Sequence, residues 1–426
     1  MTTSFLRGAM LALATATSML ALQPAHAATD AAAVVKHYAD VAHAKYSDAL
    51  STARALDKAI DALIATPSEA TLKAAREAWL KARNPYQETE VYRFGNPIVD
   101  EWEGKVNAWP LDEGLIDYVD PSYGTESDEN ALFTANVIAN KTIKIAGKDV
   151  DASKITPEFL SGTLQEAGGI EANVATGYHA IEFLLWGQDL NGNGPGAGNR
   201  PYTDYDKANC TGGNCDRRAE YLKAASELLV SDLKEMVGNW TPDGAATKNI
   251  EGDAKAGLIA ILTGMGSLSY GELAGERMKL GLLLHDPEEE HDCFSDNTYN
   301  SHLYDALGIQ QAYTGEYTKV DGTKMTGPSL SELVAAKDPA LDKEMKDKLA
   351  ATVEAMQAMA KRGETVEKYD QMIAEGNTEG NAVVQKAIDG LIDQSKTVQR
   401  VLASLDLGTV ELEGSDSLDN PNAVFQ

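Results

Sequence analysis

The stretch DAAAVVKHYADVAHAKYSDALSTARALDKAIDALIATPSEATLKAAREAWLKARNPYQETEVY, residues 30–92, decides the fold class. Its apolar residues recur at spacings of three and four in a background rich in Ala, Lys and Glu, which is the pattern of amphipathic helices. The pattern is interrupted near Thr66-Pro67-Ser68. The stretch therefore predicts two consecutive helices.

The same helical periodicity returns through most of the chain. It covers residues 170–186, 216–237, 254–284, 338–374 and 381–405, which are separated by loops rich in Gly, Asn, Asp and Pro. Two segments differ, residues 141–160 and 316–334, because each predicts a short strand, a Gly-containing turn, a second strand and a helix start. We therefore expect an all-α protein with two small β-hairpin inserts.

The two hairpin segments suggest an internal duplication with its seam near residues 198–215. Each half would run helix, helix, irregular insert, hairpin, helix. At 426 residues the chain also exceeds the usual size of a single hydrophobic core. We expect two helical-bundle domains, residues 28–205 and 206–426.

Residues 1–27 have the features of a cleavable signal peptide. Arg7 is their only positive side chain, an apolar stretch follows, and Ala25-His26-Ala27 matches the small-x-small cleavage pattern. The apolar stretch is shorter than the roughly 20 residues that span a bilayer, and no later segment predicts a transmembrane helix. We expect a periplasmic protein that is free in solution.

The charge of the chain limits its partners. It contains 37 Lys and Arg against 65 Asp and Glu, a formal net charge of −28. Such a charge repels nucleic acid and anionic membranes and favours cationic ligands, although it also serves solubility alone. We expect no nucleic-acid partner, and metal ions are the better candidates.

The three cysteines are expected to have different roles. Cys210 and Cys215 in NCTGGNC can close a small loop in an oxidising compartment, because the intervening glycines allow a tight turn. A zinc knuckle would need a second Cys or His pair nearby. We expect a disulfide between these two, and a free or buried thiol at Cys293.

The segment GYHAIEFLLWG, residues 177–187, carries the strongest candidate site. His179 and Glu182 are three residues apart on one face of a helix whose other residues are apolar. In an interior both groups need partners or a metal, and helical bundles build metal sites from this pair and facing carboxylates. A buried His–Glu hydrogen bond that only specifies packing explains the spacing equally well.

The segment RNPYQETEVYRFGNP, residues 83–97, offers Glu90 as the facing carboxylate. A surface pair between Glu90 and Arg93 at spacing three is the simpler explanation. GELAGERMKLG, residues 271–281, places Glu272, Glu276 and Arg277 before another helix end and resembles a counterpart in the second half. No H-E-x-x-H, G-x-S-x-G or P-loop is present.

Two further segments contain residue types that can serve as cation ligands. HDPEEEHDCFSDNTYNSH, residues 285–302, is dense in His, Asp and Glu, but it has no metal-ligand spacing, so we expect a solvated acidic loop. Asp189, Asn191 and Asn193 match the first half of a calcium loop, but Arg200 stands where a bidentate Glu is required. We expect a flexible Gly/Asn linker there.

These segments, together with VNAWPLDEGLIDYV at residues 106–119, resemble the imelysin family in its iron-regulated protein A-like branch. The likeness spans nearly the whole mature chain, and the family motif G-x-H-x-x-E is met by Gly177, His179 and Glu182. The resemblance implies an exported two-domain helical-bundle protein connected with iron acquisition. The family is catalogued with metallopeptidases.

The resemblance also implies roles for residues. It makes His179, Glu182 and Glu90 metal-site candidates and Arg93, Glu276 and Arg277 candidates for pocket lining. We therefore expect a metal-binding protein, for iron first and zinc second, that serves iron uptake or handling with an envelope transport partner. The alternatives are a metallopeptidase in which the metal activates water, and a non-catalytic binding module for another ligand or protein.

Overall fold

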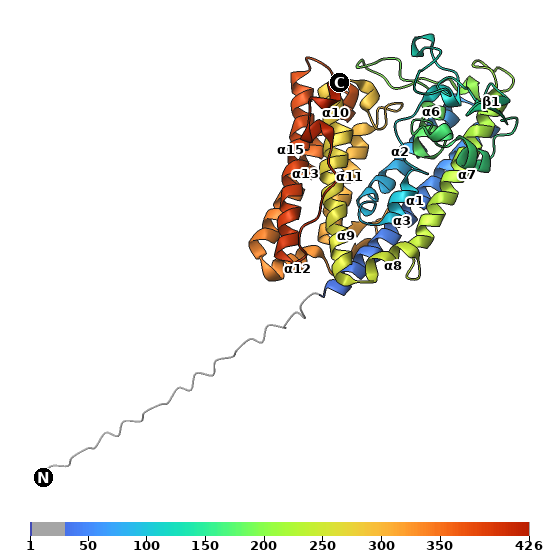
Figure 1. The fold of residues 1–426 in the computed structure, drawn as a ribbon. Helices are drawn as coiled ribbons and strands as arrows, with labels where there is room; N and C mark the ends of the chain where they lie inside the picture. Colours follow the sequence, from blue (N-terminus) through green and yellow to red (C-terminus); the bar gives the residue numbers. More distant parts are fainter. Residues whose placement is uncertain (2–29, 426) are drawn as a thin grey trace.

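The computed structural model describes Met1 and residues 30–425, so the rest of the predicted signal peptide lies outside the described residues. Two groups of helices stand side by side, one containing α1, α2, α6 and α7 and the other α9, α11, α13 and α15 (Figure 1). No helix within residues 30–425 is long and apolar enough to cross a membrane.

The predicted helices of residues 30–92 form α1 (Ala31–Ala65) and α2 (Glu69–Gln87), which pack against each other. Ser68 begins α2, because its hydroxyl accepts from the Thr71 N–H while the Thr71 hydroxyl accepts from the Ser68 N–H. α7 (Cys215–Asn239) packs against α1 and α6 (Gly177–Trp186). The shorter elements of this half are η1 (Glu90–Tyr92), α3 (Pro97–Glu103), α4 (Glu113–Ile116), η2 (Pro121–Tyr123), α5 (Pro157–Phe159), η3 (Leu160–Leu164), η4 (Ala167–Gly169) and η5 (Tyr202–Asp204).

The second group contains four long helical runs. α9 (Ala254–Ser267), the π-helical segment η6 (Leu268–Lys279) and α10 (Leu280–Leu284) follow one another without a break. α13 (Pro339–Thr365) packs against both α11 (Thr298–Thr314) and α15 (Thr378–Ser404). The shorter elements are α8 (Ala245–Glu251), η7 (Pro287–Glu289), α12 (Leu330–Lys337), α14 (Tyr369–Ile373), α16 (Asp416–Asp419) and η8 (Ala423–Phe425).

Both predicted hairpins are present, which confirms the all-α fold with small β inserts. β1 (Thr142–Ile145) pairs antiparallel with β2 (Lys148–Asp151), and β3 (Glu316–Thr318) pairs antiparallel with β4 (Lys324–Thr326). The duplication itself stays a prediction. The expected division at residues 205 and 206 assigns α7 to the second half, whereas its packing places it in the first group.

Three predicted boundaries were wrong. The helix expected over residues 170–186 begins only at Gly177, because Ile170 and Thr176, at the two ends of the preceding stretch, have extended backbones. The helix expected over 338–374 is broken between α13 and α14. Residues 298–302, expected in a loop, are the first turn of α11, a helix that the sequence did not reveal.

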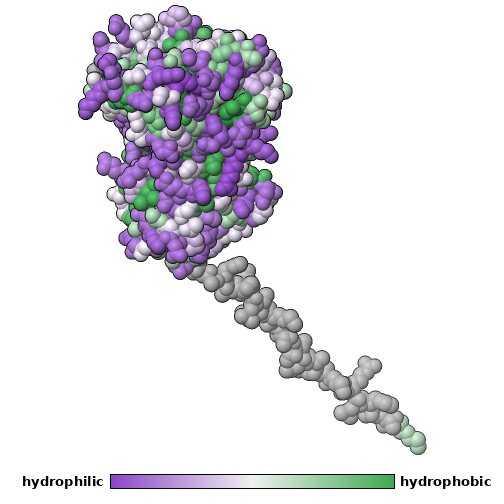
Figure 2. Space-filling view, turned by 90° about the vertical axis from the view of Figure 1, so that its right-hand side faces the viewer, coloured by the Kyte–Doolittle hydropathy of each residue, from purple (hydrophilic) through white to green (hydrophobic). Residues whose placement is uncertain are grey.

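The two groups share one continuous hydrophobic core. α2 packs against α11, and α1 packs against α9. Within the first group, the ring of Tyr92 lies 4.7 Å from that of Tyr38 and 5.4 Å from that of Trp240, centroid to centroid. The face shown in Figure 2 is mostly hydrophilic, with apolar side chains scattered over it. The halves therefore form one packed body.

Gly177 fixes the start of α6. Its φ of +77° lies in the left-handed region, and a Cβ at this position would lie 2.3 Å from the carbonyl oxygen of Val106. The next residue, Tyr178, donates its N–H to that same oxygen at 2.8 Å. A side chain at position 177 would therefore push α6 away from this segment.

We predict that Gly177→Ala lowers the free energy of unfolding by about 2–4 kcal/mol, because it adds backbone strain and a steric overlap. Urea unfolding measures the change. The matched control is Gly238→Ala in α7, where an added Cβ meets nothing within 4 Å. That control should be neutral or stabilising by up to about 1 kcal/mol. Equal effects of the two substitutions would contradict this account.

Candidate metal centre

His179 and Glu182 are both completely buried on α6. His179 Nδ1 lies 3.3 Å from Glu182 Oε2, and Glu182 Oε1 accepts from the N–H and the hydroxyl of Ser295 at 2.9 and 2.6 Å. Burial, together with the charge of Arg83, holds the pKa of His179 well below its usual value, so the ring is neutral. With its one proton on Nδ1 toward Glu182, Nε2 carries the lone pair and faces Arg83 Nη2.

Arg83 of α2 joins this pair to Asp292, a residue of the segment before α11. Its Nε and Nη2 donate to Asp292 Oδ1 at 3.0 and 2.8 Å, and its Nη1 donates to Asn107 Oδ1 at 2.6 Å. Arg83 Nη2 also lies 3.3 Å from His179 Nε2. Burial raises the pKa of Asp292, but the guanidinium of Arg83 outweighs it and keeps that pKa below its usual value. Asp292 is therefore a buried carboxylate anion.

His291 completes the cluster. Its ring lies 4.8 Å from the ring of His179, centroid to centroid, and its buried Nε2 has no hydrogen-bond partner. One ligand atom from each of His179, His291 and Asp292 lies within 4.8 Å of the others. Burial holds the pKa of His291 well below its usual value, so this ring is also neutral. Two neutral imidazoles and a carboxylate are a suitable donor set for a transition metal.

A cleft of about 620 Å³ leads to this cluster. His291 lines it beside Asn107 and Trp109, whose indole ring lies 5.1 Å from the ring of His179. The three residues expected to line a pocket, Arg93, Glu276 and Arg277, all lie in its wall. The wall is strongly acidic, with Glu103, Glu166, Glu171, Glu272, Glu276 and Glu289.

Glu90 lies in a neighbouring cluster around Arg277. It accepts from the hydroxyl of Tyr86 at 2.7 Å and from Arg277 Nη2 at 2.7 Å, and it is buried. Arg277 also donates to Glu272 at 2.8 Å and to Asp305 at 3.2 Å. The structure therefore does not gather Glu90 with the three potential ligand atoms. The simpler expectation of a surface Glu90–Arg93 pair was wrong, because Glu90 is buried and pairs with Arg277; Glu90 as a metal-site residue stays a prediction.

Residues 285–302 do not form the solvated acidic loop that we expected. Glu290, His291, Asp292, Asp296 and His302 are all buried. Some of their polar groups find partners inside: the Asp292 N–H donates to Thr298 Oγ1 at 3.0 Å, and Thr298 Oγ1 donates to Glu290 Oε2 at 2.7 Å. These contacts keep polar groups satisfied away from water.

Arg83, Asn107, His291 and Asp292 were missed as site residues. Arg83 and Asn107 both lie in segments that carried the family resemblance. The signal that could have drawn attention to Arg83 is a charged side chain placed to face an apolar helix, because arginine is rarely buried without a partner. Asp292 was grouped with the acidic loop. Its true environment depends on Arg83, which lies 209 positions away in the sequence.

The cysteines agree with the expectation. Cys210 and Cys215 are joined by a disulfide with their Cα atoms 5.9 Å apart. Cys293 is a free, buried thiol.

The buried His302 of α11 makes stability depend on pH. Burial and the nearby Arg277 lower its pKa from about 6.5 to about 3. Between these two pH values His302 is neutral in the folded protein and protonated in the unfolded chain. This contribution to stability is complete above pH 6.5 and is lost as the pH falls toward 3. His302→Leu should reduce the loss of unfolding free energy between pH 7 and pH 5 by about 2 kcal/mol. Urea titrations at both pH values measure it, and parallel pH profiles for variant and wild type would refute it.

The chain is similar to known proteins over most of its length. A family model described as Imelysin (Peptidase_M75) matches residues 42–398. Iron-regulated protein A of Synechococcus elongatus is 34% identical over 71 residues, which cover 16% of this chain and 20% of that protein. The crystal structure of a protein described as an iron-regulated protein A precursor, from Parabacteroides distasonis, matches with a TM-score of 0.63 and 19% identity, covering 89% of this chain and 97% of that chain. That likeness shows a shared fold.

Proposed function

Because the chain belongs to the imelysin family, we propose that it binds a metal ion, iron first and zinc second, through His179, His291 and Asp292. Two observations carry the proposal: one potential ligand atom from each of these residues lies within 4.8 Å of the others, and the buried His291 Nε2 has no hydrogen-bond partner within residues 30–425. A buried nitrogen lone pair without a donor is costly unless something occupies it.

The chemistry of these groups fits such an ion. Imidazole and carboxylate ligands suit iron and zinc, and metal ligands must be unprotonated, as the lowered pKa values of His179, His291 and Asp292 ensure. Glu182 plays the part of the carboxylate that fixes a ligating histidine through its other nitrogen. In this assignment Glu182 is a positioning residue and not a ligand.

The acidic wall of the cleft supports capture of a cation from the surrounding solution. Six glutamates line it, and only Arg93 and Arg277 oppose them there. A cleft lined mostly by one sign of charge raises the local concentration of the opposite ion. We infer a role in iron uptake or handling in the periplasm, with delivery to an envelope transport partner. The related proteins named for iron regulation support this role.

Metal binding should depend on His291 as a ligand and on Glu182 as the residue that positions His179. We predict that His291→Ala weakens Fe²⁺ or Zn²⁺ binding more than about 100-fold, and that Glu182→Gln weakens it about 10- to 100-fold. Anaerobic isothermal titration calorimetry measures both. Glu171→Gln, at the cleft wall, is the control for diffuse electrostatics and should change affinity less than about threefold. If wild type and His291→Ala bind equally well, the proposed site is wrong.

Arg83 is the cation that now neutralises Asp292, so an incoming metal must compete with it. We predict that Arg83→Met is destabilised by about 3–5 kcal/mol without metal, because Asp292 loses its partner in the interior. A metal ion replaces the missing positive charge, so Zn²⁺ should raise the melting temperature of the variant more than that of the wild type. Thermal unfolding with and without Zn²⁺ measures both values. Equal increases would mean that the ion does not contact Asp292.

Hydrolysis of a peptide is the competing assignment. It requires a carboxylate that is free to accept a proton from a metal-bound water. Both oxygens of Glu182 are already engaged, by Ser295 and by His179, so binding is favoured over hydrolysis. Incubation with unfolded substrates with and without chelator separates the two, since cleavage that the chelator abolishes would establish a peptidase. A binding module without metal predicts no calorimetric signal.

A further inference from the structure

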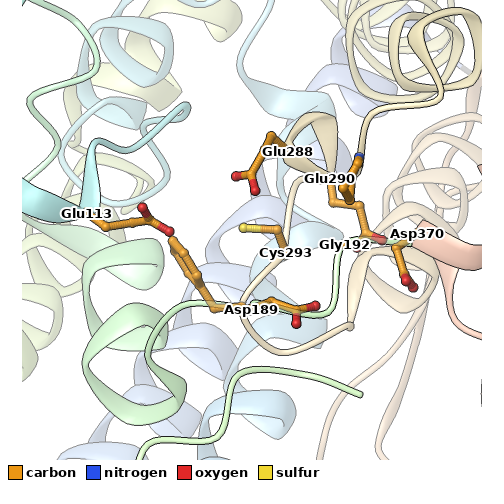
Figure 3. A pocket seen from close by; sticks show the side chains of 9 residues that line it. Glu113, Asp189, Gly192, Glu288, Glu290, Cys293 and Asp370 are labelled. Atoms are coloured by element: carbon orange, nitrogen blue, oxygen red, sulfur yellow. The ribbon is translucent and has the colours of Figure 1, made fainter. Parts of the chain in front are cut away.

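A second group of carboxylates surrounds a small space whose lining includes Glu290 and Cys293, the residues on either side of His291 and Asp292 in the sequence (Figure 3). In Figure 3 the carboxyl groups of Glu113 and Glu288 and the thiol of Cys293 point toward the same space. Asp189, Glu290 and Asp370 complete the lining on the opposite side, and none of the histidines of the metal centre belongs to it. The two sites are therefore distinct.

Several oxygens around this space have no partner. Glu290 and Asp370 are 1% and 2% exposed, yet Glu290 Oε1 and both carboxylate oxygens of Asp370 accept no hydrogen bond. Within residues 30–425, neither these two residues nor Glu113, Asp189 or Glu288 forms an ion pair with a lysine or arginine. Buried carboxylates without donors or counter-charges are costly, so the arrangement requires an additional group.

The dimensions of the space indicate what that group is. The cavity measures about 10 Å³, which is the room needed for one water-sized sphere and excludes an organic ligand. Burial, and secondarily repulsion from neighbouring carboxylates, raises the pKa of Asp370 to about 7 and that of Glu113 to about 8. A cation bound in this space would offset both the cost of burying these carboxylates and their mutual repulsion.

The sequence contributes an independent argument. Asp189, Asn191 and Asn193 begin like a calcium loop whose closing Glu is absent from position 200. The structure brings the missing carboxylates from remote segments, Glu290 and Asp370, to the same pocket as Asp189. The amide of Asn193 donates to the carbonyl oxygen of Asp370 at 2.8 Å and ties the half-loop to this wall.

We propose that this pocket is a second cation site, in which Asp189, Glu290 and Asp370, with Glu113 and Glu288 at its other side, hold one divalent cation that prefers oxygen ligands. Such an ion is of the calcium, magnesium or manganese class. This site goes beyond the proposed iron site and does not depend on it.

The test titrates Mn²⁺ and, separately, Ca²⁺ into the full protein by calorimetry at 0.5 M salt, roughly the ionic strength that suppresses diffuse binding to an acidic surface. Asp370→Asn keeps the shape of the side chain and removes its charge. We expect it to weaken the binding of one ion per chain at least about tenfold. Its melting temperature without metal should equal or exceed that of the wild type, because a repelling charge is removed.

Two matched variants complete the experiment. Asp128→Asn neutralises an exposed carboxylate and should leave the affinity unchanged. His291→Ala should also retain it while losing Fe²⁺ or Zn²⁺ binding, so failure of one site is distinguished from failure of the other. Absence of a saturable signal in the wild type, or equal affinity of wild type and Asp370→Asn, would mean that the pocket holds only water and would overturn the proposal.

Discussion

The ion pair between Arg83 and Asp292 is the interaction on which the rest of the site depends. Both side chains are completely buried, and the pair joins α2 of the first helical group to the segment before α11 in the second. Removing either partner would leave an uncompensated charge in the interior, which costs far more than the pair itself contributes. The pair therefore fixes how the two groups meet, and with it the positions of His179 and His291.

The same principle recurs elsewhere in the molecule. Arg277 bridges Glu90 of the first half to Asp305 of α11, and Arg218 of α7 pairs with Asp117 through Nε at 2.6 Å. Each of these buried arginines satisfies a carboxylate that is distant in the sequence. A guanidinium has several donors in a fixed plane, so one arginine can determine the positions of two or three segments at once. The pairs made by Arg83 and Arg277 cross between the groups, so their interface is specified by charge as well as by the shared apolar core, whereas the Arg218–Asp117 pair acts within the first group.

Much of the fold could be predicted because amphipathic periodicity reports burial on one face. α1, α2, α7 and both hairpins followed from it. α11 did not, because polar residues such as His302 and Asp305 are buried beside Ile309 and Tyr313, and no clean apolar stripe remains. Interior polar residues remove the signal on which such a prediction rests.

The candidate site was predictable only in part, for a related reason. His179 and Glu182 share one helix, so their spacing alone places them together. Asp292 and Arg83 meet through tertiary packing, which no local pattern records. For Glu90 the sequence was misleading in the opposite way. Its position within a motif of the family resemblance suggested a metal ligand, whereas its carboxylate accepts a hydrogen bond from Arg277.

The two proposed cation sites share one backbone segment, residues 290–293, and this connects their chemistry. Its two middle residues, His291 and Asp292, contact His179 and Arg83, whereas Glu290 and Cys293 at its ends line the acidic pocket. The hydroxyl of Thr298 accepts from the Asp292 N–H and donates to Glu290 Oε2, so one hydroxyl links both sides. A displacement of Glu290 toward an ion would be felt at the Asp292 backbone through this hydroxyl, since packed interiors transmit small shifts. Occupancy of the acidic pocket would then bias the geometry of the histidine site, and the coupling would act equally in the reverse direction.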